Sequence, residues 1–169
     1  MTTYIALLRA VNVGGTGKLP MAELKAMAVE LGFDNVRTYI ASGNLLFDSK
    51  LSAAKAGALL AARLQQYAGK PVGVIMRTAA EMADVRDAFP FKDAAGNRAV
   101  VVFLDAAPPA DALEHIKGQQ DEECALGPRE IFIHYGSGMG QSKFEIKAAK
   151  AGTARNLNTV AKLADMAGA

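Results

Sequence analysis

The stretch from residue 4 to residue 20 constrains the fold most, because an apolar segment runs directly into a glycine-rich one. Residues 4–13 are rich in branched and apolar side chains and predict a strand, whose alternate residues point to opposite faces of a sheet. Both faces are mainly apolar, which is typical of a central strand covered on two sides. Arg9 on one face and Asn12 on the other are therefore expected to need polar partners.

Glycine occupies three of the four positions in residues 14–17, directly after this strand. Pro20 suits the first turn of a following helix, so the pattern predicts a strand, a loop and a helix N-terminus in order. Such a junction can hold an anion, and Lys18 would add a positive charge. It is not a P-loop, because Asn12 and Leu19 stand where Gly and Ser or Thr are required, and Pro20 excludes a GxGxxG motif. The alternative is a tight connection that binds nothing.

Apolar spacing, β-branched segments and turn residues predict a βαββαβ order for the first half of the chain. This order is the ferredoxin-like split βαβ arrangement, an antiparallel sheet with two helices on one face. After the first strand, the expected elements are a helix over 21–31, strands over 36–40 and 45–47, a helix over 52–67 and a strand over 72–76.

The second half predicts a related order, βαββαα, in which a helix replaces the last strand. We therefore predict an α+β fold of two ferredoxin-like halves packed together with mainly antiparallel sheets, over residues 1–77 and 78–169 of one compact unit. The expected elements are a connecting helix over 79–88, then a strand over 99–104, a helix over 110–116, strands over 123–125 and 130–135, and helices over 143–150 and 157–166.

Composition indicates a soluble globular protein. The chain has 169 residues, 51% hydrophobic and 21% charged, which is enough for one large domain or two small ones. No stretch is long enough to span a bilayer and no signal peptide is recognisable, so no membrane association is expected. A single cysteine, Cys124, excludes an internal disulfide framework and favours a cytoplasmic location.

The net charge of +2 is unevenly distributed along the chain. Residues 1–77 carry nine basic and four acidic side chains, residues 78–140 carry five and eleven, and residues 141–169 carry five and two. If the two ends of the chain meet, their positive excess would favour an anionic ligand. Ordinary surface charge that serves solubility is the alternative interpretation.

Four ordered motifs, LLRAVNVGGTGKLPMAELKAMAVELGF, VRTYIASGNLLF, YGSGMGQSKF and TARNLNTV, resemble a bacterial family catalogued as domain of unknown function 1697. The resemblance covers nearly the whole chain and implies an α+β fold with two related ferredoxin-like halves, but no established activity. Relatives commonly carry Trp where this chain has Leu157, so an aromatic contact there would be absent or weaker. The polar residues on the motif positions, which we take as candidate ligand-binding residues, are Arg9, Asn12, Lys18, Ser42, Asn44, Ser142, Lys143, Arg155, Asn156, Asn158 and Thr159.

The C-terminal motifs suggest a second site of the same kind. A glycine-rich loop over residues 136–140 follows a predicted strand and leads into a predicted helix, as in the first half. Thr153 is a candidate cap of the last helix, with Arg155 and Asn156 in or near its first turn. Arginine binds phosphate or carboxylate well, but such side chains also hold loop backbone in place.

Other chemistry has less support. His115 and His134 lack the spacing of metal ligands, and no metal or cofactor is expected. Cys124 is expected to be a small core residue without a nearby base. The acidic run over residues 121–123 is expected to be a solvated turn rather than an acid/base pair.

These features leave several functions open. Our preferred hypothesis is a protein that binds a small anionic ligand, such as a nucleotide or another phosphate or carboxylate compound, at its glycine-rich loops. The first alternative is an enzyme acting on a phosphorylated or carboxylated small molecule, although no base or nucleophile stands out. An RNA-binding or protein-interaction module is the second alternative, and the strands lack the aromatic RNA-recognition motif.

Overall fold

The computed structural model describes residues 1–12, 18–92, 94, 96–136 and 142–168. The chain divides into two compact units, Met1–Met82 with Leu163–Ala169 and Ala83–Lys162, and each is described by itself. Within the described ranges, no helix is long and apolar enough to cross a bilayer.

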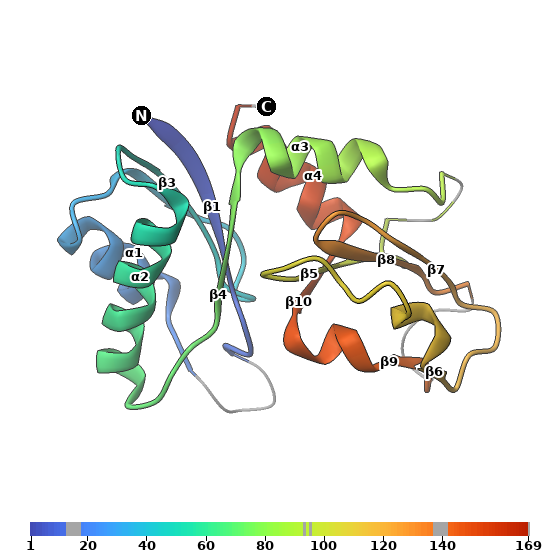
Figure 1. The fold of residues 1–169 in the computed structure, drawn as a ribbon. Coiled ribbons are helices and arrows are strands. Elements are labelled where there is room, and N and C mark those ends of the chain that lie inside the picture. Colours follow the sequence, from blue (N-terminus) through green and yellow to red (C-terminus); the bar gives the residue numbers. More distant parts are fainter. Residues whose placement is uncertain (13–17, 93, 95, 137–141, 169) are drawn as a thin grey trace. The chain divides into compact units, whose positions relative to one another are not determined.

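The first unit has the ferredoxin-like βαββαβ order and sheet (Figure 1). Its strands pair antiparallel in the order β2-β3-β1-β4, so β3 separates β1 from β2 as in a split βαβ unit. Helices α1 and α2 cover one face of this sheet. The elements are β1 (Thr2–Leu8), α1 (Met21–Glu30), β2 (Asp34–Thr38), β3 (Asn44–Ser49), α2 (Ala53–Ala68) and β4 (Val74–Thr78).

Both faces of β1 are buried, as its sequence predicted. Tyr4, Ala6 and Leu8 belong to the core cluster under the two helices, while Ile5 and Leu7 on the opposite face are 0% exposed. The sheet is thus held by apolar burial on both sides.

The first strand ends at Leu8, so the prediction that it extends to residue 13 was wrong. The backbone turns there, because Ala10 and Asn12 adopt positive φ angles of 58° and 55° that are incompatible with a strand. Arg9 and Asn12 are consequently exposed rather than buried in the sheet.

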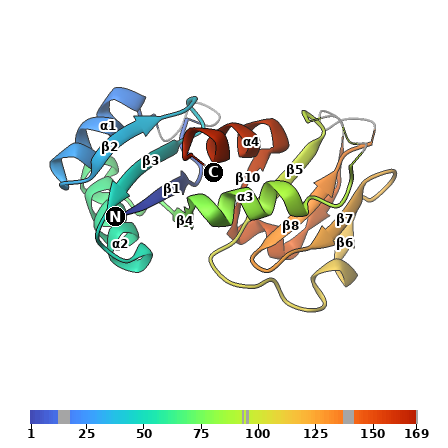
Figure 2. The same cartoon turned by 90° about the horizontal axis from the view of Figure 1, so that it is seen from above.

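The second unit contains a four-stranded antiparallel sheet in the order β10-β5-β8-β7 (Figure 2). This is the order of the first sheet, so the α+β fold with two ferredoxin-like halves is confirmed. Helix α4 begins in this unit and ends in the first, where Arg37 of β2 donates to the Met166 carbonyl. Helix α3 (Ala79–Ala88) begins in the first unit and ends in this one. The other elements are β5 (Ala99–Phe103), β6 (Ile116–Lys117), β7 (Glu123–Leu126), β8 (Glu130–His134), β9 (Glu145–Ile146), β10 (Thr153–Asn156) and α4 (Leu157–Met166).

Two expected helices of this unit are absent from the described residues, and three unexpected strands, β6, β9 and β10, are present. The segment 110–116 forms only a 3₁₀ turn, Ala112–Glu114, before β6. The segment 143–150 forms β9, which pairs with β6, and the 3₁₀ helix Lys147–Ala151. Residues 153–156 are the final strand β10, paired with β5, so the predicted βαββαα order was wrong. In each case pairing with a distant strand outweighs the local helix propensity.

Candidate functional site

A pocket of about 540 Å³ lies at one end of the first unit. Its walls come from the end of β1, the residues before α1, the last turn of α2 and the connection from α2 to β4. The lining residues are Arg9, Ala10, Val11, Lys18, Leu19, Leu64, Tyr67, Ala68, Lys70, Pro71 and Val72.

The pairing of β1 with β4 positions Arg9. Leu8 pairs with Val74 at the end of this ladder. One residue further on, the Arg9 N–H donates to the Gly73 carbonyl at 2.9 Å. The Arg9 side chain runs over Gly73, where an added Cβ would lie only 3.1 Å from the Arg9 Cβ. Glycine at position 73 therefore lets the arginine stem lie close to the backbone.

Asn12 positions Lys18 by fixing the backbone of the next residue. Its Oδ1 accepts from the Leu19 N–H at 2.8 Å, and its Nδ2 donates to the Leu19 carbonyl at 2.8 Å. Nδ2 also donates to the Ala41 carbonyl at 2.8 Å. Leu19 is buried at 3% exposure, so Lys18 is held at the edge of the core with its own side chain exposed.

Lys70 follows the end of α2. Gly69 terminates this helix with a φ of 74°, and its N–H donates to the Gln65 carbonyl at 2.9 Å. This left-handed residue turns the chain so that Lys70, Pro71 and Val72 line the pocket.

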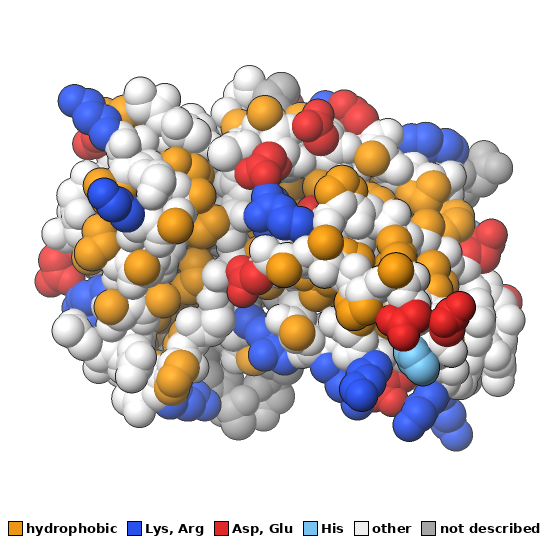
Figure 3. Space-filling model, in the orientation of Figure 1, with side chains coloured by type: hydrophobic (Ala, Val, Ile, Leu, Met, Phe, Trp, Pro, Cys, Tyr) orange, Lys and Arg blue, Asp and Glu red, His pale blue; other side chains and the backbone are white. Residues whose placement is uncertain are grey.

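The pocket is strongly cationic. Its described lining contains Arg9, Lys18 and Lys70 and no Asp, Glu, His or Cys. Lys18 and Lys70 make no ion pair or hydrogen bond with any described residue. The C-terminal end of α2 contributes about half a negative charge, which offsets only part of this excess. Figure 3 shows basic side chains at this end of the first unit, around the end of β1 and the connection that leaves α2.

The rest of the pocket is apolar. Val11, Leu19 and Leu64 form a buried floor, with exposures of 4%, 3% and 1%. Tyr67, on the last turn of α2, is 42% exposed. The pocket thus combines a cationic rim with a surface for an apolar or aromatic group.

Ser42 and Asn44 hold the turn between β2 and β3 instead of lining the pocket. The Asn44 side chain is 0% exposed and donates to the Tyr39 carbonyl at 2.9 Å and to Ser42 Oγ at 3.0 Å. Their polar atoms therefore satisfy the hairpin, which is a structural role.

The candidates on the C-terminal loop also have structural contacts. Ser142 Oγ donates to Glu122 Oε2 at 2.6 Å and accepts from the Phe144 N–H at 3.2 Å. The hydrogen bond from Ser142, together with one from the Gln120 N–H, lowers the pKa of Glu122. Lys143 is exposed and lies beside Gly118, where a Cβ would clash with the Lys143 carbonyl at 2.2 Å.

Arg155 is buried in the second unit, at 6% exposure. It donates to Thr153 Oγ1 at 2.6 Å and to the Ala154 carbonyl at 2.9 Å, and burial lowers its pKa to about 10. The guanidinium remains charged at neutral pH and is held by its own strand. The prediction that Thr153 caps the last helix was wrong, because Thr153 belongs to β10.

Asn156 is the residue that caps α4. Its Oδ1 accepts from the Thr159 N–H at 2.9 Å, which is an N-cap hydrogen bond. Thr159 is buried at 6% exposure. Asn158 is exposed, and its side chain lies beside Gly96, where an added Cβ would lie 1.9 Å from Asn158 Oδ1.

The structure therefore brings together two of the predicted site residues, Arg9 and Lys18, in one pocket. The two glycine-rich loops at which the sequence predicts ligand binding include residues 13–17 and 137–141, which lie outside the described residues. Sequence reasoning missed Tyr67 and Lys70. The ferredoxin-like order contained the signal, because β4 lies antiparallel beside β1 and the start of β4 must meet the end of β1.

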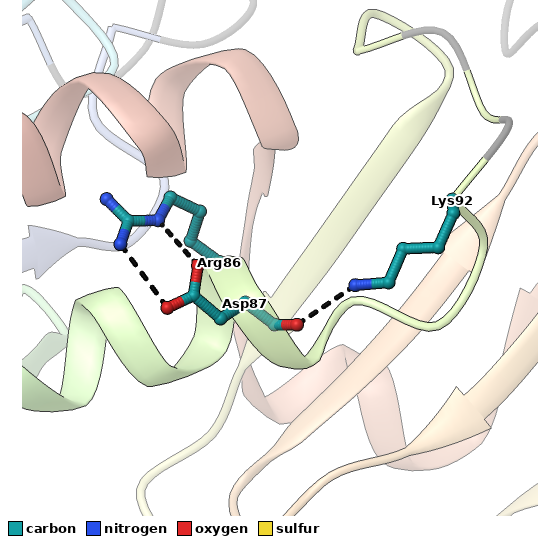
Figure 4. Close-up of polar contacts among 3 residues, drawn as sticks. All are labelled: Arg86, Asp87 and Lys92. Carbon is teal, nitrogen blue, oxygen red and sulfur yellow. Dashed lines mark hydrogen bonds and ion pairs between the residues drawn. The ribbon is translucent and has the colours of Figure 1, made fainter.

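A second charged cluster, in the second unit, has a structural explanation (Figure 4). Arg86 Nε and Nη2 donate to the two Asp87 carboxylate oxygens at 2.9 and 3.3 Å, and this contact lowers the pKa of Asp87. Lys92 Nζ donates to the Asp87 carbonyl at 2.9 Å, at the C-terminal end of α3. A cation at this end of a helix is favoured by the helix dipole.

Metal ligands do not gather anywhere in the described parts of the chain: no group of three His, Cys, Asp or Glu residues could hold an ion there. Each histidine lies beside one carboxylate: His115 Nε2 is 3.2 Å from Asp111 Oδ2, and His134 Nδ1 is 3.3 Å from Glu123 Oε1. Cys124 is half-buried, which raises the pKa of its thiol.

Comparisons with known proteins agree with this fold. A solved structure described as conserved bacterial protein SP0830 from Streptococcus pneumoniae is similar, with 25% identity, a TM-score of 0.81 and 98% of each chain covered. No functionally curated protein matches the sequence. The model of the family described as protein of unknown function (DUF1697) matches residues 1–132, and the chain therefore belongs to this family.

Proposed function

We propose that the protein binds a small anionic ligand, a phosphate or carboxylate compound, in the pocket of its first unit. The observation that carries this proposal is the presence of Arg9, Lys18 and Lys70 around one pocket whose described lining has no acidic side chain. Like charges gathered around a concave surface repel one another, and a bound anion relieves this repulsion.

The size of the electrostatic attraction supports a preference for anions. A ligand charge about 4 Å from one of these cations would gain about 1–4 kcal/mol, depending on exposure to water. The three cations therefore outweigh the partial negative charge at the end of α2. The volume of about 540 Å³ is that of a typical small-molecule site.

The enzyme hypothesis has less support from this pocket. A general base or a nucleophile is required for most transfer or hydrolysis reactions. The described lining offers only Tyr67, Lys18, Lys70 and Arg9 as polar side chains. The pocket supports binding and orientation of an anion more directly than its conversion.

RNA binding is also less supported. Sheets of this class that bind RNA stack bases on exposed aromatic residues of the open face. The corresponding face of the first sheet carries Ile5, Leu7 and Leu46, all 0% exposed. These residues are aliphatic, so this part of the face offers no aromatic ring on which a base could stack.

Inorganic phosphate tests the proposal directly. Titration followed by amide correlation NMR should shift the signals of Arg9, Lys18, Lys70 and Gly73, and phosphate should raise the melting temperature by mass action. Lys70→Ala should weaken binding about tenfold or more. Lys55→Ala, a change of equal charge at the other end of α2, is the matched control and should leave the affinity unchanged.

Saturable binding with shifts at these positions supports the proposal. It fails if phosphate, pyrophosphate and citrate all leave the pocket signals unchanged. It also fails if Lys70→Ala and Lys55→Ala lose affinity equally, because the overall charge of the protein, and not the position of Lys70 in the pocket, would then determine phosphate binding.

A further inference from the structure

We propose that the ligand is an aromatic phosphomonoester, such as a nucleoside monophosphate, whose ring lies against Tyr67 and whose phosphate is held by Arg9, Lys18 and Lys70. This inference rests on the proposed function and adds the class of ligand. Four features of the pocket carry it: its charge, its apolar floor, its exposed ring and its size.

Charge selects a monoester over a diester or a simple carboxylate. A phosphomonoester carries about −1.5 to −2 charges at neutral pH and offers three strong acceptor oxygens. A diester or a monocarboxylate carries one negative charge, which is fewer than the two lysine charges, Lys18 and Lys70, in the lining. Arginine also forms paired hydrogen bonds with phosphate oxygens, and lysine acts as a point charge.

Tyr67 provides the surface for the ring. It projects from the last turn of α2 beside the pocket and is 42% exposed. Within the described part of the chain, its ring stacks on no other aromatic side chain and its hydroxyl makes no hydrogen bond. A flat, half-exposed ring of this kind can stack on any base, because every base has a π-face.

The ring and the cations line one pocket of about 540 Å³. Tyr67 and Lys70 leave the same end of α2 on either side of Gly69, while Arg9 and Lys18 come from the end of β1 and the start of α1. Leu64 forms the buried floor beside Tyr67, so a ring placed on Tyr67 would also cover apolar surface. The phosphate of the same molecule would then lie toward the cations on the rim.

Matched ligand pairs test the inference in the full-length protein. We would measure dissociation constants of adenosine monophosphate, ribose phosphate, adenosine and cyclic adenosine monophosphate by calorimetry, with phenyl phosphate and methyl phosphate as a second pair. Each ring-bearing monoester should bind about tenfold more tightly than its partner without a ring, as expected for one stacking contact. The cyclic diester and adenosine should both bind more weakly than the monoester.

Variants at position 67 separate stacking from folding. Tyr67→Ala should abolish the advantage of the ring-bearing ligands while leaving the affinity for ribose phosphate within about twofold. Tyr67→Phe should retain the advantage, because the ring remains. The exposed side chain lets both variants keep the melting temperature of the free protein nearly unchanged.

The outcomes distinguish the two proposals. Equal affinity for ring-bearing and ring-free monoesters, or an unchanged advantage in Tyr67→Ala, overturns this inference while the proposed function stands. Equal affinity for the monoester and the cyclic diester also overturns it, because the charge argument would fail. If none of the phosphate compounds binds and citrate also leaves the pocket signals unchanged, the proposed function itself is refuted.

Discussion

Polar side chains in the glycine-rich motifs of this protein mostly satisfy their own backbone. Asn12 fixes Leu19, Asn44 closes the β2–β3 turn and Asn156 caps α4, each with a side-chain amide that matches nearby backbone groups. Such residues are costly to replace, because the groups they leave behind are buried without partners. The proposed ligand site relies instead on exposed cations, of which Arg9 and Lys18 are the two that lie on motif positions.

Ser142 is a residue whose structural role can be measured through pH. Its hydroxyl lowers the pKa of Glu122, so the interaction stabilises the fold above the ordinary glutamate pKa of 4.5 and is lost as the pH falls through the lower folded value. We expect Ser142→Ala to raise the pKa of Glu122 and to reduce stability mainly above pH 4.5. NMR titration of the carboxyl signal and urea unfolding at several pH values measure both effects.

Ser142→Thr keeps the hydroxyl and is the matched control. It should retain the lowered pKa of Glu122. An identical Glu122 titration in Ser142→Ala and the native protein would mean that the backbone N–H of Gln120 alone sets this pKa.

At the scale of elements, the β2–β3 turn lies very close to the end of β1. The Leu8 N–H donates to the Gly43 carbonyl at 2.9 Å. Gly43 has a φ of 91°, and a Cβ there would lie 2.6 Å from Val11 Cγ2 and 2.9 Å from Leu8 Cβ. Both the backbone conformation and the space require glycine.

Gly32 gives a matched comparison, because it has a similar φ of 86° but nothing within 4 Å of an added Cβ. Gly32→Ala should therefore cost only the backbone strain, about 1–2 kcal/mol. Gly43→Ala should cost about 1–3 kcal/mol more, because the methyl group overpacks against Val11 and Leu8. Urea unfolding curves measure both values, and equal losses would show that the turn can move away from β1 without cost.

At the scale of the whole molecule, the net charge of +2 is too small to attract anions over a distance. In about 0.1 M salt the Debye length is about 10 Å, so only the charges around the pocket act on a bound ligand. The local arrangement of cations, and not the overall charge, then decides affinity.

Two charge reversals separate these contributions. Lys70→Glu and Lys25→Glu each reduce the net charge from +2 to zero, but only Lys70 lines the pocket. We expect Lys70→Glu to abolish phosphate binding and its dependence on salt, and Lys25→Glu to leave both nearly unchanged. Calorimetry over a range of salt concentrations measures the effect, and equal losses in the two variants would contradict it.

Local patterns predicted much of the fold. The expected range of α3 and of α4 agrees with the structure at both ends, because helix propensity and apolar spacing act over neighbouring residues. The helices expected over 110–116 and 143–150 were wrong because Ile116 and Ile146 pair across the chain. The final strand β10 was missed for the same reason, since Arg155 pairs with Val101 far away in sequence.

The sequence by itself determined the buried β1, the hairpins, the strand order of the first half and the presence of Arg9 and Lys18 on a candidate site. Only the tertiary structure decided that Tyr67 and Lys70 join them, and that Ser42, Asn44, Ser142 and Arg155 hold the fold instead. The physical reason is that the type of a residue decides which groups its side chain can bind. Which of those groups lies within reach is decided by the register of the strands. The pairing of Leu8 with Val74 brings the end of β1 to the start of β4 and thereby forms the pocket.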